Sequence, residues 1–162
     1  ARCPWATFGK LKHRGPNIVT SLELDPAEME KRNIHLQQKY AEIEEKEVRY
    51  EEIHCDDAEY LIVAFGSCAR IAQKAMEEAR AEGIKVGLLR PITLWPFPSK
   101  AIAERSRQVK GILTVELNAG QMVEDVRLAV ECKVPVEYFG RLGGIVPDPD
   151  EVVTALKEKI IK

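Results

Sequence analysis

The stretch Tyr60-Leu61-Ile62-Val63-Ala64-Phe65, followed at once by Gly66-Ser67, decides the fold. Six apolar residues in a row, without polar alternation, predict a strand that is covered on both faces. Gly66 permits a tight turn, and Ser67 is the predicted N-cap of the next helix. The apolar residues of that helix recur at helical spacing: Ile71, Ala72, Ala75, Met76 and Ala79.

A second strand follows this helix. Gly83 stands where the helix is expected to stop, and residues 84–89 form the strand. A strand, a helix and a strand within about thirty residues make a βαβ unit, which requires parallel strands and a right-handed crossover. The sequence therefore predicts an open α/β sheet.

The segments around this unit extend the same domain, predicted at residues 47–162. Val48, Tyr50 and Ile53 predict a polar edge strand ahead of it. Downstream we expect strands at 111–115 and 134–139, and helices near 99–103, 122–130 and from Asp148. Three prolines within residues 91–98 exclude regular structure there and predict a rigid loop.

The first part of the chain differs in character. Residues 26–46 predict a charged linker helix with one narrow apolar seam. Residues 1–25 show no sustained periodicity and are interpreted as a loop or the tail of a missing upstream domain, to whose core Trp5 and Phe8 would belong.

Composition excludes several classes of function. The 162 residues carry 24 basic and 26 acidic side chains, so neither nucleic acid nor an anionic membrane is indicated as a partner. No apolar run approaches the ~20 residues that span a bilayer. The four cysteines are scattered, so we expect no disulfide framework, no iron–sulfur or zinc site made by this chain alone, and a reducing cytoplasm. No Ser-His-Asp or Cys-His set can be assembled, so no catalytic residue is assigned.

Three stretches resemble one family. Phe65-Gly66-Ser67 resembles the "YGS" turn of transketolase C-terminal domains, and residues 83–98 resemble the "G-kv-gll-r-p-tl-PFP" segment that follows it. Residues 115–122 resemble the "vvE-N-GQM" of the alpha subunit of thiamine-dependent 2-oxoacid:ferredoxin oxidoreductases. The resemblance covers about residues 20–162. Residues 21–25 depart from the "HDE-G"-like stretch of this branch, which leaves the substrate subclass open.

The resemblance implies a three-layer α/β/α, transketolase C-terminal-domain-like fold. Its five-stranded, mostly parallel sheet has the order 1-3-2-4-5, with the first strand antiparallel. Ligands of open α/β sheets bind where the strand order reverses, here between Gly66-Ser67 and residues 116–118. The candidates for binding an anion, a ligand or a partner at this edge are Ser67, Arg90, Glu116, Asn118, Gln121 and Arg141.

We expect free amides of two helix N-termini, near Ser67 and Gly120, to meet there with Arg90 and Arg141 in a small electropositive pocket. Glu116 is expected to orient one arginine, and the anion to be a partner's carboxylate or part of coenzyme A. Structural alternatives stay open: Ser67 as a mere N-cap, Glu116 and Asn118 bonding loop backbone, and the arginines paired with acids.

Trp95 and Phe97 are large apolar residues in the proline loop. Both either pack on the domain or face a partner, because an exposed patch of this size is unusual.

The implied enzyme oxidatively decarboxylates a 2-oxoacid (2-oxoglutarate, a branched-chain 2-oxoacid or pyruvate) to an acyl-CoA. Thiamine diphosphate, Mg²⁺ and iron–sulfur clusters belong to the assembled enzyme, and none is expected to bind this chain. The implied partners are a beta subunit that binds thiamine diphosphate, gamma and delta subunits, and ferredoxin. This domain would serve subunit contacts and the approach of substrate or coenzyme A.

Two other classes remain open. The chain could belong to another thiamine enzyme, such as a decarboxylating dehydrogenase beta subunit or a transketolase-type synthase, although the "GQM" stretch argues against this. It could also be a free-standing regulatory module that binds an anion. More than about 150 further residues upstream in the intact gene would favour either subunit over the module.

Overall fold

The computed structural model describes residues 12, 13, 15 and 22–161. Trp5 and Phe8 lie outside the described residues. Helix α1, Pro26–Lys46, is the predicted charged helix, and none of its residues is buried. Residues 40–162 form one compact unit, which begins inside α1, at Tyr40. The division of the chain into tail, linker and domain stays a prediction.

The sheet of this unit has the predicted topology. Strand order is β1-β3-β2-β4-β5. The edge strand β1 runs antiparallel to β3, and the other neighbours are parallel. The strands are β1 Tyr50–Ile53, β2 Tyr60–Ala64, β3 Val86–Pro91, β4 Ile112–Glu116 and β5 Val136–Gly140. The predicted five-stranded, mostly parallel sheet is thus confirmed.

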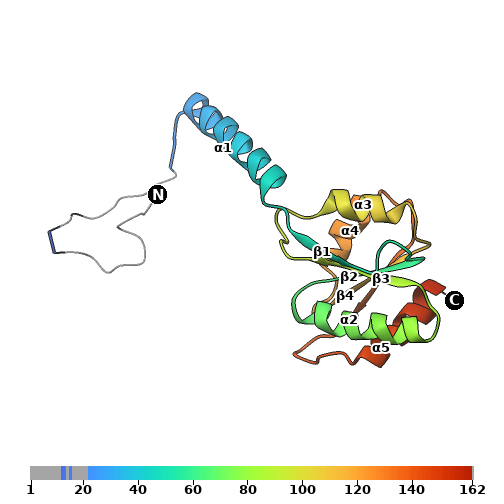
Figure 1. Ribbon diagram of the computed structural model, residues 1–162. Coiled ribbons are helices and arrows are strands. Elements are labelled where there is room, and N and C mark those ends of the chain that lie inside the picture. Colours follow the sequence, from blue (N-terminus) through green and yellow to red (C-terminus); the bar gives the residue numbers. More distant parts are fainter. Residues whose placement is uncertain (1–11, 14, 16–21, 162) are drawn as a thin grey trace. The chain divides into compact units, whose positions relative to one another are not determined.

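Helices cover both faces of the sheet and give it three layers. Helices α2 and α5 lie on one face, and α3 and α4 lie on the other (Figure 1). Their bounds are α2 Gly66–Ala81, α3 Ser99–Ser106, α4 Met122–Val130 and α5 Pro149–Leu156, with a π-helical turn, Lys157–Ile161, after α5. Every helix in the described part of the chain is too short or too polar to cross a bilayer.

The apolar run of residues 60–65 contains no polar residue because strand β2 contributes side chains to two hydrophobic cores. Ile62 and Ala64 pack against α2 and α5, whereas Leu61 and Val63 pack on the opposite side with α3 and α4. All four side chains are fully buried. Successive strand residues point to opposite faces, so a strand covered on both faces needs apolar residues at every position.

The start of α2 differs from the prediction. Its N-cap is Phe65, with φ −128° and ψ 165°, and no side chain caps the helix. Gly66 has a φ of +56° and is already the first helical residue. An N-cap side chain must come from the extended residue before the first turn. Ser67 lies inside that turn, so its predicted capping role is wrong.

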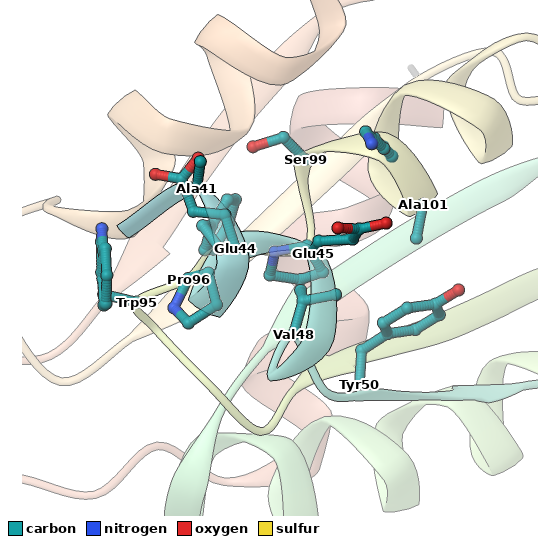
Figure 2. Close-up of a pocket in the computed structure, with 12 residues that line it drawn as sticks. Ala41, Glu44, Glu45, Val48, Tyr50, Trp95, Pro96, Ser99 and Ala101 are labelled. Carbon is teal, nitrogen blue, oxygen red and sulfur yellow. The ribbon is translucent and has the colours of Figure 1, made fainter. Parts of the chain in front are cut away.

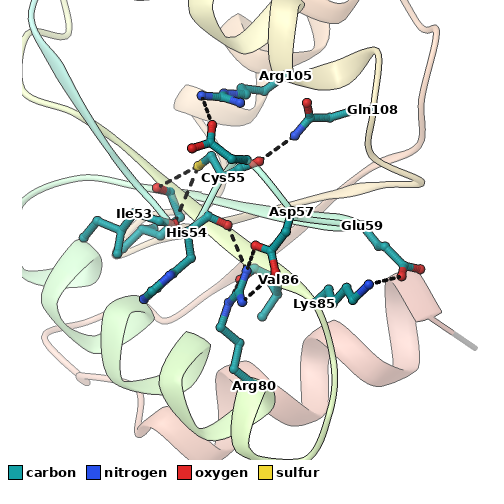
Figure 3. A network of polar contacts seen from close by, with 12 residues as sticks. Ile53, His54, Cys55, Asp57, Glu59, Arg80, Lys85, Val86, Arg105 and Gln108 are labelled. Carbon is teal, nitrogen blue, oxygen red and sulfur yellow. Dashed lines mark hydrogen bonds and ion pairs between the residues drawn. The ribbon is translucent and has the colours of Figure 1, made fainter.

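A polar network fastens the loop between β1 and β2 at the amino-terminal ends of the parallel strands (Figure 3). Arg80 of α2 donates to both carboxylate oxygens of Asp57, at 2.5 and 3.1 Å, and to the carbonyl oxygens of His54 and Val86, at 2.9 and 2.8 Å. The bonds from Arg80 lower the pKa of Asp57.

The same loop and strand β1 are tied to α3 and to the turn that follows α3. Arg105 makes a two-pronged ion pair with Glu52, and Gln108 donates to the Cys55 carbonyl oxygen at 2.5 Å. Burial raises the pKa of the Cys55 thiol to about 11. The network lies at the amino-terminal ends of the parallel strands, whereas the predicted site lies at their carboxyl ends. Its polar groups bond one another, so its role is to stabilise the fold.

Candidate functional site at the carboxyl edge of the sheet

The structure places the reversal of strand order where the family resemblance implies it. β2 and β4 are direct neighbours, with Ala64 opposite Val115. The turn into α2 and the loop 117–121 therefore leave the sheet side by side. Of the predicted site residues, Ser67, Asn118 and Gln121 belong to these two segments, and Glu116 is the last residue of β4.

Glu116 is fully buried at the end of β4 and bonds backbone amides. Its carboxylate accepts hydrogen bonds from the N–H groups of Gln121, Met122 and Val123, at 3.1, 2.8 and 3.0 Å. These are the amides at the start of α4, so Glu116 supplies the negative charge that a helix N-terminus attracts. The expectation that Glu116 orients an arginine is wrong, and the amides near Gly120 are occupied from within the domain.

The loop from Leu117 to Gln121 is held in one conformation. The Asn118 side-chain oxygen accepts from the Gly120 amide at 2.7 Å, and the Tyr138 hydroxyl donates to the Asn118 carbonyl oxygen. Gly120 has a φ of +99°, in the region that favours glycine. Of this loop, Leu117, Ala119 and Gln121 are exposed. Most of the "E-N-GQM" pattern is therefore structural, and it presents three side chains outward.

Glu116 adds negative charge to this part of the edge. Burial, with a smaller contribution from Glu116, raises the pKa of the Cys68 thiol and of the Tyr138 hydroxyl. Burial, Glu124 and Glu116 together raise the pKa of Asp125. The buried charge beside α4 is thus an acidic one, which the backbone amides of the helix hold.

The two predicted arginines lie apart. Arg90 on β3 donates to Glu51 of β1 at 2.8 Å, and Arg141, which follows β5, pairs with Glu151 of α5. β2 and β4 lie between their strands, which at a spacing of ~4.8 Å puts them on the order of 14 Å apart. Each arginine pairs with a glutamate, which agrees with the alternative that both arginines are paired with acids. The two side chains therefore do not meet at one site.

The start of α2 is the part of the expected anion site that remains open. No side chain caps this helix, and Ser67 is exposed. On the neighbouring strand β3, Arg90 Nε is one of two buried side-chain atoms without a hydrogen-bond partner in the described part of the chain. Anion binding at Ser67 and Arg90 stays a prediction.

Trp95 and Phe97 have different environments. Phe97 is half-buried and packs against the core beneath α3 and α4. Trp95 is 56% exposed, and its ring meets the Tyr40 ring edge-on, with centroids 5.6 Å apart. The sequence did not predict this contact. Tyr40 does lie on the apolar seam of the charged helix, which is the one pattern that pointed to it.

Metal ligation finds no support in the described residues, which contain no group of three His, Cys, Asp or Glu side chains placed to hold a metal ion. Thiamine diphosphate with Mg²⁺ would need free oxygen ligands. Glu116 is committed to three amides, so the buried carboxylate at this edge does not fit that cofactor.

Comparison with known proteins identifies the family. The family model described as pyruvate:ferredoxin oxidoreductase core domain II matches residues 58–152, more than half of the chain. The chain is 49% identical over 154 residues to ketoisovalerate oxidoreductase subunit VorB of Methanothermobacter thermautotrophicus, covering 95% of this chain and 43% of that relative. It is 33% identical over 101 residues to 2-oxoglutarate synthase subunit KorA of Methanothermobacter marburgensis, covering 62% of this chain and 27% of the relative. The chain thus spans less than half the length of these relatives.

Solved structures agree on the fold. A 2-oxoglutarate:ferredoxin oxidoreductase from Magnetococcus marinus superposes with a TM-score of 0.73 at 24% identity, over 84% of this chain and 24% of that one. A split-gene transketolase gives a TM-score of 0.60 at 22% identity, over 68% and 40%. These similarities confirm the transketolase-like architecture. The family is assigned from the family model that matches residues 58–152: the chain belongs to the family of pyruvate:ferredoxin oxidoreductase core domain II.

Proposed function

We propose that the chain is the C-terminal domain of the alpha subunit of a 2-oxoacid:ferredoxin oxidoreductase, and that the whole enzyme converts a branched-chain 2-oxoacid, ketoisovalerate, to its acyl-CoA. One observation carries the proposal. Identity is 49% over 154 residues to a ketoisovalerate oxidoreductase subunit, against 33% over 101 residues to a 2-oxoglutarate synthase subunit.

The chemistry of decarboxylation and electron transfer comes from other parts of the enzyme. When bound, thiamine diphosphate with Mg²⁺ supplies the activation of the 2-oxoacid, and iron–sulfur clusters pass electrons to ferredoxin. We place these groups on a beta subunit and on gamma and delta subunits. In this chain Glu116 binds backbone amides and Arg141 pairs with an acid, so these two residues act on the fold.

The role proposed for this domain is to form subunit contacts and to border the path of substrate or coenzyme A. Two rigid segments support it: the loop 117–121, fixed by Glu116 and Asn118, and the proline loop, which presents Trp95. Rigid loops with exposed side chains at the carboxyl edge of a parallel sheet are suited to contacts with a ligand or partner. The enzyme is proposed to act in the cytoplasm.

The test is to produce the protein of the whole gene together with the products of its neighbouring genes, under anaerobic conditions. The purified assembly should reduce ferredoxin only when ketoisovalerate and coenzyme A are both present, with a higher kcat/KM than for 2-oxoglutarate or pyruvate. This chain alone should show no such activity and no iron–sulfur absorbance after reconstitution. A preference for 2-oxoglutarate would contradict the substrate assignment, and a protein that purifies without other subunits would contradict the whole proposal.

A further inference from the structure

A groove of about 740 Å³ runs between the last turns of α1 and the proline loop, within the compact unit that begins at Tyr40. Figure 2 shows Trp95 at one end and Tyr50 at the other, with Val48 and Pro96 between them. This volume lies within the range of ligand pockets, about 300–1,000 Å³. The carboxyl-edge loop 117–121 contributes nothing to its lining, so the groove is separate from the site described above.

The walls of the groove are aromatic and held in place. Pro96 and Pro98 are buried, and Phe97 between them packs into the core, so the loop cannot fold Trp95 away. Trp95 remains 56% exposed and Tyr50 42% exposed. Two large rings exposed in one concave surface mark a place where another molecule is buried.

The α1 side of the groove is acidic. Glu44 and Glu45 line it, and within the described chain neither makes an ion pair, whereas Glu42 pairs with Lys46 and Glu47 with Arg49. On the opposite side, Lys100 of α3 also lines the groove. Two carboxylates against one ammonium group leave uncompensated negative charge in a groove that also exposes Trp95. A guanidinium or ammonium group fits both features at once.

We propose that this groove binds an extended segment of a neighbouring subunit of the oxidoreductase, one that places an arginine or lysine beside an apolar side chain. The apolar side chain lies on Val48 and Phe97. The cation lies on the acidic α1 side of the groove, which Glu44 and Glu45 line. The inference rests on the proposed function, because the neighbouring subunit is taken from it.

The first experiment replaces Trp95 by the photo-crosslinking residue p-benzoylphenylalanine in the whole protein, assembled with its other subunits. Irradiation followed by mass spectrometry should join position 95 to one segment of another subunit, with Arg or Lys within a few residues of the link. A link to a second copy of this chain, a link to a segment without a basic residue, or no link in an intact assembly overturns the proposal. A protein that carries no other subunits contradicts the proposed function instead, so the two failures are distinct.

The second experiment reverses the charge of the acidic side. In the assembled enzyme, Glu44→Lys with Glu45→Lys should raise the dissociation constant of the contacting subunit about tenfold, because like charges then face each other. Glu77→Lys, at an exposed position of α2, is the control for a surface charge reversal and should leave assembly unchanged. The melting temperature of the isolated chain should stay the same in all variants. Wild-type assembly by the double variant excludes the cation contact.

Trp95→Ala tests the aromatic wall. Assembly should weaken while the isolated chain keeps its melting temperature, because the ring is exposed in the chain and buried only in the complex. A large loss of melting temperature with assembly intact would show that Trp95 serves only its contact with Tyr40.

Discussion

Glu116 is a charged side chain with no exposed surface, and its surroundings are amide groups instead of cations. Three charge-assisted hydrogen bonds and the dipole of α4 replace the water that the carboxylate loses on burial. The residue belongs to the chain's most specific motif, and its task is to join the end of β4 to the start of α4.

Glu116→Gln removes one acceptor and turns an NH₂ group towards backbone N–H groups. We expect the free energy of unfolding to fall by about 2–3 kcal/mol, because hydrogen bonds to a charged group are lost in a buried place. Denaturant unfolding of the isolated chain measures this. Glu77→Gln, at an exposed position without an ion pair in the described chain, should change stability little. Equal stability of the Glu116 variant and the wild type would show that the charge is unimportant.

Ser67 and Arg90 carry what remains of the anion prediction. Sulfate soaked into crystals should appear within hydrogen-bonding reach of the Ser67 amide, because no side chain caps α2. No anion should appear at the Gln121 amide, which already bonds Glu116. If sulfate is missing from the start of α2, and Arg90→Ala leaves the KM for coenzyme A unchanged in the whole enzyme, the start of α2 is structural.

At the scale of elements, the loop 117–121 shows how a short segment is fixed from both ends. Gly120 adopts a φ of +99°, and a Cβ there would lie 3.2 Å from Val123 Cγ1. Gly120→Ala should therefore lower the free energy of unfolding by roughly 1–2 kcal/mol, through backbone strain and crowding. The neighbouring Ala119→Gly is the control, since Ala119 is exposed. Similar melting curves for the two variants would contradict the account of the loop.

The helices and strands of the domain could be predicted from the sequence. An apolar run names a strand covered on both faces, and the 60–65 run is shared between two cores as that rule requires. Local contacts were less accessible. A serine after a glycine resembles an N-cap. The residue at which the helix begins depends on the backbone conformation of Gly66, which the pattern of residue types does not reveal.

The site was harder to predict than the fold because partners are chosen in three dimensions. The sequence indicated that Glu116, Arg90 and Arg141 follow strands of one sheet, but not which acid each arginine would meet. In the folded chain Arg90 meets Glu51, and Arg141 meets Glu151. The groove beside Trp95 was equally hidden, since it needs the last turns of α1 to pack against a loop about fifty residues away.

At the scale of the whole molecule, ion pairs between distant segments make stability depend on pH. Hydrogen bonds from Arg80, Lys110 and Arg141 lower the pKa values of Asp57, Glu59 and Glu151 respectively, below ordinary values of 3.8, 4.5 and 4.5. A carboxyl group whose pKa is lowered on folding stabilises the protein above its unfolded pKa, and that contribution disappears as the pH falls through the folded pKa.

We therefore expect the melting temperature to be nearly level from about pH 7 to 5 and to decline below about pH 4.5. Asp125, whose pKa is raised, acts in the opposite sense, but it is one carboxyl group against four in the described chain, since Lys133 also lowers the pKa of Glu131. Calorimetry across this range checks the prediction, and Asp57→Asn should make the acid decline shallower. A melting temperature that rises on acidification would show that the three pairs contribute nothing.

The backbone amides at the start of α4 bond a side chain of the same domain, Glu116, and this has a consequence for redesign. Truncating Glu116 to alanine leaves a cavity shaped like a carboxylate, lined by three amides that no longer have an acceptor. A small acid of matching shape, such as formate, can then restore what the side chain supplied. We expect formate to raise the melting temperature of Glu116→Ala and not that of the wild type. The substitution would thus turn a structural side chain into a binding site for an added molecule.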